Sequence, residues 1–313
     1  HHRSSNLAFW HTPQSVNTLT EEDLSTLRAY PQNFEAKIGI IETVDRHGVI
    51  MLDYKGSLGL QYNPNAIAQL ALGWYDRILA GEKNTGEFLR QAEFFIRNGR
   101  KIKDGILLWE YAFPFEMRNH LSAPWRSALA QGQGISVCLR AFMLTGGKKY
   151  LNAAEMAFNA FRHLAREHPG GVLDDSQGYF WLEEYIVTPP NHVLNGFIWA
   201  LWGIREYAVF TNDAHAWKLW HECVRTLCEN LQNYDLGFWT SYDSPEGNSG
   251  RLPVMPCSIY YQKLHIIQME AMYRLTRDTV FEKYAGRWRR QLAKLVNRAV
   301  SQAWKAYFKL RWF

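Results

Sequence analysis

The sequence contains no apolar run that approaches the roughly 20 residues needed to span a bilayer, so no transmembrane helix is expected. Its N-terminus also lacks the basic and then apolar pattern of a signal peptide. A cytoplasmic location follows if residue 1 is the native start. His1 and His2 are, however, consistent with the remains of a purification tag, so the location is left open.

Several common motifs are missing as well. There is no glycine-rich phosphate loop, no HExxH, no GxSxG elbow and no Ser/His/Asp set with informative spacing, which argues against nucleotide-binding, metalloprotease and serine-hydrolase functions. The cysteines show neither CxxC nor Cys/His metal spacing, so we expect no structural disulfide and no metal site. They are Cys138, Cys223, Cys228 and Cys257.

Positively and negatively charged residues are nearly balanced, with 35 Lys and Arg against 30 Asp and Glu. The formal net charge of +5 is modest and spread along the chain, which suits an anionic ligand but gives no dense basic patch, so no nucleic acid partner is expected. Aromatic residues are abundant, with 13 Trp, 16 Tyr and 17 Phe. Such rings stack on sugars, although core packing is the commoner reason for them.

The hydrophobic pattern is mainly helical. Residues 37–44 and 48–54 read as two short strands joined through Asp45–Gly48, a small N-terminal β-hairpin. From Pro64 onward a 3.6-residue period predicts consecutive amphipathic helices. Their ranges are 66–80, 87–99, 127–145, 149–168, 192–210, 214–232, 258–276 and 279 to about 305.

Consecutive antiparallel helix pairs bury their apolar faces against each other, which favours a mainly α fold of the α/α toroid type, an incomplete α/α barrel. We expect an N-terminal segment with the hairpin in residues 1–57 and the α/α-barrel domain in residues 58–313. Three connecting stretches concentrate aromatic, acidic and basic residues, namely 105–134, 178–196 and 237–265. Because binding sites are commonly built on loops over a rigid scaffold, these stretches are the candidates for a cleft.

Two carboxylates and a phenol, Glu183, Glu184 and Tyr185, stand together in the second stretch. A paired carboxylate here is either a solvated turn or cap, or a proton-handling group. A phenol with an ordinary pKa near 10 needs a nearby positive charge before it acts as a base at neutral pH. Tyr242 and Tyr261 stand at a loop tip and a helix start; each taken alone is more often structural than catalytic.

Two basic residues, His265 and Arg126, can also be interpreted as either functional or structural. His265 follows Tyr261 by one helical turn and would share its face, but a lone helical histidine is usually a structural residue. Arg126 precedes a small-residue helix start that would let a ligand approach closely, and its ordinary role would be a surface ion pair.

The segment GYFWLEEYIVTPPNHVLNGF closely resembles the Trp-Tyr-Glu-Glu-Tyr-Pro-Thr-Thr-Pro and Val-Leu-Asn-Gly-Phe signature of the heparosan-type D-glucuronyl C5-epimerases. In the same order, PWRSALAQGQG is similar to the family's Trp-Tyr-Ser-Ala-Met-Ala-Gln-Gly-Gln segment. SYDS matches the start of its Tyr-Asp-Leu-Arg-His motif, and YYQKLHIIQME is similar to its Tyr-His-Thr-Thr-His-Ile-Asn-Gln-Leu helix. The resemblance covers residues 58–80 and 105–290.

The resemblance implies an α/α barrel and places residues of this chain on family positions. Catalytic positions fall on Glu184, Tyr185, Tyr242 and Tyr261, and positions expected to line the substrate groove fall on Trp125, Gln131, Asn195 and His265. Two features depart from the family. Only about 25 residues stand in place of its large β-barrel domain, and Ser244, Pro245 and Glu246 follow Asp243 where the motif has its arginine. We therefore predict that Arg126, or as second choice Arg251, holds the uronate carboxylate.

The implied activity is inversion of C5 in D-glucuronate residues of a heparosan-like polysaccharide, giving L-iduronate by proton removal and return to the opposite face. Glu184 or Tyr185 on one side and Tyr261 on the other would handle the protons, with Tyr242 stabilising charge. Proton transfer alone requires no metal or organic cofactor. A uronate polysaccharide lyase or hydrolase on the same toroid, and a non-catalytic glycan-binding protein, are the alternatives. The expected partner is an anionic polysaccharide, and a homodimer is left open.

Overall fold

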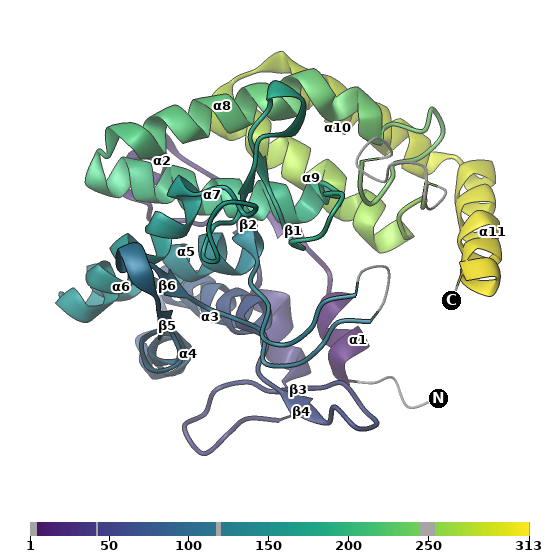
Figure 1. Ribbon diagram of the computed structural model, residues 1–313. Helices are drawn as coiled ribbons and strands as arrows, with labels where there is room; N and C mark the ends of the chain where they lie inside the picture. Colours follow the sequence, from purple (N-terminus) through teal and green to yellow (C-terminus); the bar gives the residue numbers. More distant parts are fainter. Residues whose placement is uncertain (1–4, 42, 117–119, 245–253, 313) are drawn as a thin grey trace.

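The computed structural model describes residues 5–41, 43–116, 120–244 and 254–312 (Figure 1). Within these residues the chain forms consecutive helix pairs, as the periodicity predicts. The pairs are α3 (Pro64–Leu79) with α4 (Gly86–Arg97), α5 (Ala128–Thr145) with α6 (Lys148–Phe158), α7 (Leu194–Thr211) with α8 (Ala214–Asn230), and α9 (Ile259–Thr276) with α10 (Thr279–Ala293). The mainly α prediction is confirmed.

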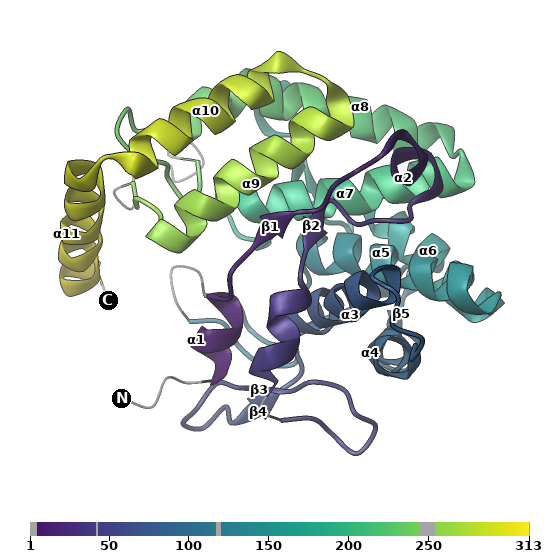
Figure 2. The same ribbon diagram turned by 180° about the vertical axis from the view of Figure 1, so that it is seen from behind.

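The first helices of the pairs form an inner row and the second helices an outer row. Helices α3, α5, α7 and α9 contact one another in this order, and each packs against the helix that follows it. The row is an open arc, so the prediction of an incomplete α/α toroid is confirmed. In Figure 2 the N-terminal segment runs across α9 and α7 toward α3, on the side where the arc is open.

Close approach of α5 and α7 depends on two glycines. A Cβ atom on Gly203 would lie 2.2 Å from the carbonyl oxygen of Gly132, and a Cβ on Gly132 would lie 2.6 Å from Cα of Ala200. The two backbones therefore touch directly, which only glycine permits. Between the same helices, Arg140 and Glu206 form a fully buried bidentate ion pair with distances of 2.7 and 2.8 Å.

The N-terminal segment packs into the same core. It contains α1 (Ser5–Trp10), β1 (Ser15–Val16), α2 (Glu21–Thr26), β2 (Gln32–Asn33) and the 3₁₀ helix η1 (Glu35–Ile40). Strands β1 and β2 pair antiparallel, and both contact α9. Phe9 and Phe34 belong to the core cluster that also contains Trp288 of α10. The domain boundary after residue 57 stays a prediction.

The small hairpin is present, but its first strand is shorter than predicted. Val44 and Ile50 form an antiparallel bridge around the Asp45–Gly48 turn, and β3 (Leu52–Asp53) pairs with β4 (Leu60–Gln61). The start of the predicted strand is instead η1. This segment packs against α3, where Gly73 leaves room for the backbone at Phe34.

The connecting stretches all precede inner helices and therefore meet at one end of the arc. They contain the short ladders β5 (Arg100–Lys101) with β6 (Leu107–Leu108), and β7 (Leu173–Asp174) with β8 (Trp181–Leu182). The last helix, α11 (Leu295–Trp312), begins after a break at Lys294, whereas the sequence predicted one helix up to about residue 305; in Figure 1 it projects from the body. Among the described residues, no helix combines the length and apolarity required to cross a bilayer.

Candidate active site

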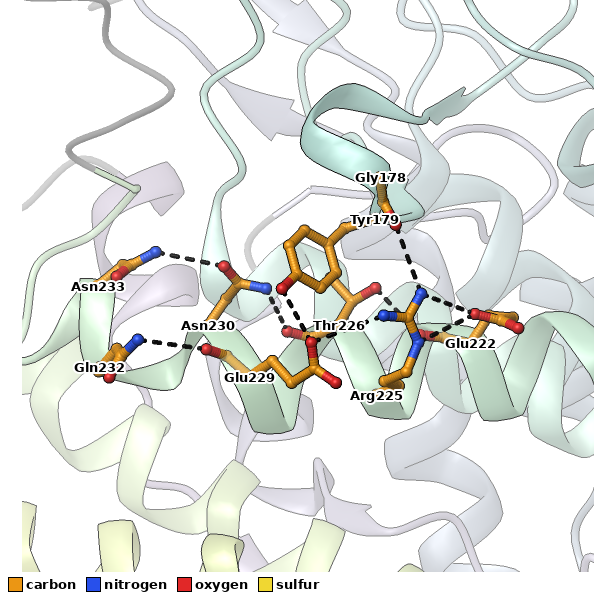
Figure 3. A network of polar contacts seen from close by, with 9 residues as sticks. All are labelled: Gly178, Tyr179, Glu222, Arg225, Thr226, Glu229, Asn230, Gln232 and Asn233. Atoms are coloured by element: carbon orange, nitrogen blue, oxygen red, sulfur yellow. Dashed lines mark hydrogen bonds and ion pairs between the residues drawn. The ribbon is translucent and has the colours of Figure 1, made fainter.

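The loop between β7 and β8 is attached to the outer helix α8 by a polar network (Figure 3). The Tyr179 hydroxyl donates to Oε2 of Glu229 at 2.8 Å, and Nη2 of Arg225 donates to the carbonyl of Gly178 at 3.4 Å. The Arg225 guanidinium also lies 5.3 Å from the centroid of the Tyr179 ring. Strand β8 therefore ends at a fixed position, and Glu183 and Glu184 follow it directly.

Both carboxyl groups of this pair are buried, which excludes the solvated turn that the sequence left open. Glu183 is 2% and Glu184 is 8% exposed. The pKa of Glu184 is raised to about 7, mainly by burial; hydrogen bonds from the Tyr185 and Tyr242 hydroxyls oppose this shift, and the charge of Glu183 adds to it. Glu184 is thus divided between acid and carboxylate near neutral pH.

Three tyrosine hydroxyls gather at Glu184. Tyr242 hydrogen-bonds to both Tyr185 and Tyr261, and the rings of Tyr242 and Tyr261 meet edge to face with centroids 5.0 Å apart. Burial, and then the charge of Glu184, raise the pKa of each phenol above its ordinary value. Within the described part of the chain no cation is the leading cause of these shifts. The phenols are therefore neutral at pH 7 and suited to donating protons.

An aromatic wall stands beside this cluster. The Tyr185 ring stacks on Phe115 with centroids 4.9 Å apart and an interplanar angle of 14°. Trp125 stacks on Tyr111 at 3.7 Å and 3°, and its Nε1 donates to the carbonyl of Phe113 at 2.9 Å. These rings pack with Tyr185 into one apolar cluster next to Glu184 in the chain, which is consistent with the burial that raises the pKa of the Glu184 carboxyl.

Glu184 also lies against the first turn of α7. Nδ2 of Asn195 donates to Oε2 of Glu184 at 3.5 Å, while Oδ1 of Asn195 has no hydrogen-bond partner in the structure. At the next position, a Cβ atom on Gly196 would lie 2.2 Å from the same Oε2. The sequence analysis did not single out Gly196, although it lies within the Val-Leu-Asn-Gly-Phe motif.

The other predicted substrate-binding residues occupy different places. Gln131 and His265 are fully buried. Gln131 receives a hydrogen bond from the amide of Trp109 at 2.8 Å, and Nδ1 of His265 lies 3.0 Å from the Thr240 hydroxyl. Burial lowers the pKa of His265 to about 3, so this ring is neutral. Substrate contact by either residue stays a prediction.

Of the two arginines proposed to hold the uronate, Arg126 lies among the described residues, and its hydrogen bonds are with backbone carbonyls. The Arg126 guanidinium donates to the backbone carbonyls of Gly171 at 2.8 Å, Ala165 at 3.3 Å and His168 at 3.4 Å. Arg126 therefore does not form the surface ion pair that would be its ordinary role, and within the described part of the chain no hydrogen bond joins it to Glu184 or the three tyrosines. Its role in binding the uronate stays a prediction. Arg251 lies outside the described residues.

One partner of the glutamate pair was missed by the sequence analysis. Nδ1 of His192 lies 2.5 Å from Oε1 of Glu183, so the first glutamate is paired with an imidazole, whereas the second is hydrogen-bonded by phenols and an amide. No spacing rule identifies a contact between two residues that are nine positions apart in a loop.

The cluster can move protons. It holds one carboxyl whose pKa lies near neutrality and three neutral phenols linked by hydrogen bonds, in a buried environment that strengthens such interactions. Such a set is suited to removing a proton from carbon and delivering one elsewhere.

Comparison with known proteins points in the same direction. Residues 103–290, more than half of the chain, match the sequence model of a family described as "D-glucuronyl C5-epimerase C-terminus". A D-glucuronyl C5-epimerase of Caenorhabditis elegans is 35% identical over 219 residues, which are 66% of this chain and 35% of that protein. A protein of Methanocaldococcus jannaschii, named as uncharacterized, is 34% identical over 188 residues, which are 59% of this chain and 58% of that protein. The chain thus spans less than two thirds of either relative.

Proposed function

The chain belongs to the D-glucuronyl C5-epimerase family, and from this premise we propose that it inverts C5 of D-glucuronate residues in a heparosan-like polysaccharide. The observation that carries the proposal is the buried Glu184 carboxyl, hydrogen-bonded to the hydroxyls of Tyr185 and Tyr242 within a segment that matches the family. Because the chain spans part of each relative, the activity and its polymer are inferred and not taken over from them.

In the proposed reaction Glu184 is the base. Its pKa near 7 leaves a substantial carboxylate fraction at neutral pH, whereas the phenols of Tyr185, Tyr242 and Tyr261 keep their protons. The C5–H bond breaks, the proton passes to Glu184, and the electron pair delocalises into the adjacent carboxyl group as an enolate-like species. The Tyr261 hydroxyl then supplies a proton to the opposite face of C5. Before the next turnover Glu184 loses the proton that it took up and the Tyr261 phenolate regains one, so no net proton is gained or lost.

In the proposed reaction, neutral tyrosine hydroxyls rather than a cation stabilise the negative charge that develops on the substrate carboxyl group. In this proposal the Tyr185 and Tyr242 hydroxyls donate to the substrate carboxyl as negative charge accumulates, which stabilises the transition state more than the ground state. We propose Trp125, Gln131, Asn195 and His265 as substrate-binding residues, with Arg126 and Arg251 as candidate partners of the uronate. The chemistry is proton transfer, so it needs no cofactor.

The test is incubation with unsulfated and N-sulfated heparosan in deuterated water, followed by NMR of the uronate C5 position. We expect deuterium at C5 and iduronate signals from the wild-type protein, and neither from Glu184→Gln. Tyr261→Phe should lose most of the activity. Tyr150→Phe is the matched control, because its hydroxyl also bonds a carboxylate, Oε1 of Glu93, but on α4 and α6.

Each other result identifies an alternative. A shortened polymer with unsaturated, ultraviolet-absorbing ends would show a lyase, which begins with the same proton removal. Binding of the polymer without exchange at C5 would show a glycan-binding protein that has kept the cleft but not the chemistry. Either result contradicts the epimerase proposal.

A further inference from the structure

The loop that carries Glu184 and Tyr185 is closed at its base by its own two ends. Oε1 of Glu183 lies 2.5 Å from Nδ1 of His192, and the backbone amide of His192 donates to Oε2 of the same carboxylate at 3.3 Å. Both side chains are 3% exposed. A buried carboxylate with this pair of donors is satisfied, and breaking the pair would leave an uncompensated buried charge.

Each end of the loop is also tied to the scaffold. The Glu183 carbonyl accepts from the amide of Ala128 at the start of α5 at 2.9 Å, and the Glu183 amide donates to the carbonyl of Val172 at 3.2 Å. The His192 carbonyl accepts from the Tyr234 hydroxyl at 2.6 Å, and its ring stacks on Trp181 with centroids 4.0 Å apart. The Glu183–His192 contact therefore joins two fixed points across the intervening residues.

The backbone of His192 supports this interpretation. Its φ of 47° lies in the left-handed region, which is unfavourable for a residue with a Cβ atom and persists only where the surroundings hold it. The loop also carries its neighbours into place, since the amide of Ser244 donates to the carbonyl of Asn191 at 3.1 Å and the amide of Leu194 donates to the carbonyl of Tyr242 at 3.3 Å. Tyr242 is thus attached to the end of the loop that His192 fixes.

We propose that Glu183 and His192 are a positioning pair, which closes the 183–192 loop and holds Glu184 and Tyr185 in their reactive arrangement with Tyr242. The inference rests on the proposed function for the reaction concerned, and on the contacts above for the positioning. Neither residue touches the reacting atoms. Ser176, whose hydroxyl lies 3.3 Å from Nε2 of His192, satisfies the second ring nitrogen.

The pair also sets the charge next to the base. The Glu183 carboxylate is one of the causes that raise the pKa of Glu184. Removing this negative charge favours ionisation of Glu184, so Glu183→Gln should move the acid limb of the pH profile of kcat/KM to lower pH. A residue with a merely structural role would lower stability without moving this limb.

The experiment compares His192→Ala, His192→Gly and His192→Asn with the wild-type protein. Glycine relieves the left-handed backbone but provides no donor, whereas the Asn amide stands close to the place of Nδ1 and tolerates this backbone conformation. We expect kcat for C5 exchange, per mole of folded protein, to fall about 100-fold in the Ala and Gly variants with little change in KM. His192→Asn should recover at least about tenfold of the loss.

A second measurement needs no substrate. Amide hydrogen exchange of the peptide spanning 184–191 should be at least about tenfold faster in His192→Ala and His192→Gly than in the wild-type protein. Asp104→Asn is the matched control for Glu183→Gln, because Asp104 also pairs with a histidine, at 2.9 Å from Nε2 of His168. It should change neither the exchange of this peptide nor the pH profile.

The outcomes separate the two proposals. Absence of C5 exchange by the wild-type protein would contradict the proposed function, while the amide exchange would still decide whether the pair closes the loop. Unchanged protection of residues 184–191 in His192→Ala would overturn the positioning pair. Wild-type kcat in folded His192→Gly, an Asn variant no better than Ala, or an unmoved pH limb in Glu183→Gln would overturn it as well.

Discussion

Gly196→Ala should inactivate the protein without unfolding it. The new Cβ atom would lie 2.2 Å from Oε2 of Glu184, 2.7 Å from its Cβ and 2.9 Å from its Cδ. Rotation of the Glu184 side chain could move its oxygen but not its Cβ, which is attached to the backbone of the loop. Since carbon atoms pack at about 3.5 to 4.0 Å, Glu184 must shift by about 1 Å.

A displacement of this size is large for proton transfer. Misplacing a reacting group by about 1 Å costs on the order of 100-fold in rate. The overlap costs about 1 to 3 kcal/mol of stability, but the preference for alanine over glycine in a helix, about 1 kcal/mol, offsets part of this loss. We therefore expect kcat/KM for deuterium incorporation at C5 to drop about 100-fold, while the melting temperature falls only modestly.

Gly286→Ala is the control for this prediction. Gly286 also lies within a helix, α10, but the nearest atom to its added Cβ is Nη1 of Arg290 at 3.5 Å, an ordinary contact with a flexible side chain. This variant should keep full activity and be slightly more stable. Full activity in folded Gly196→Ala would refute the reasoning, because it would mean that the observed position of Glu184 is not needed for the reaction.

Three further predictions concern charge. The kcat/KM for C5 exchange should rise with pH through about pH 7, because burial raises the pKa of Glu184 to about 7 and only its carboxylate accepts a proton; a limb near the ordinary glutamate pKa of about 4.3 would contradict this. Arg140→Met, which leaves Glu206 buried without its partner, should lower the free energy of unfolding in urea by about 3 to 5 kcal/mol. Its control is Arg289→Ala, which breaks an exposed ion pair and should cost less than about 1 kcal/mol. Equal losses in the two variants would contradict the conclusion that the buried Arg140–Glu206 pair matters more for stability. Arg126→Ala should raise KM for the polymer if this side chain holds the uronate, and unchanged activity would remove it from the site.

The helices could be predicted from the sequence because their signals are local. Apolar residues recur with a period of 3.6 along each segment, and side-chain caps mark the starts, as Asn63 does for α3, Asp213 for α8 and Ser258 for α9. The segment at residues 35–40 shows where this fails. Its apolar residues are too few to separate a strand from a 3₁₀ helix, and packing against α3 decides the outcome.

The candidate site was predictable only as a set of motif positions. Glu184, Tyr185, Tyr242 and Tyr261 meet in space, and the sequence assigned them to one site only through the resemblance of its motifs to those of the family. The partners of Arg126 carried no such signal, because every residue offers a backbone carbonyl and the sequence does not reveal which ones face a guanidinium. The contact of Glu183 with His192 depends on how the 183–192 loop closes, which local spacing does not describe.

The two adjacent glutamates show how environment divides roles that the sequence presents as one feature. Glu183 faces the imidazole and backbone amide of His192, which satisfy its carboxylate and keep it in place. Glu184 faces phenols and the amide of Asn195, which satisfy it less fully, and burial then raises its pKa into the range where it can both take and release a proton. The charge of the first raises the pKa of the second. A substitution that makes residue 183 neutral should therefore bring the pKa of Glu184 closer to that of an ordinary carboxylate. Glu184 would then be a weaker base for a carbon-bound proton.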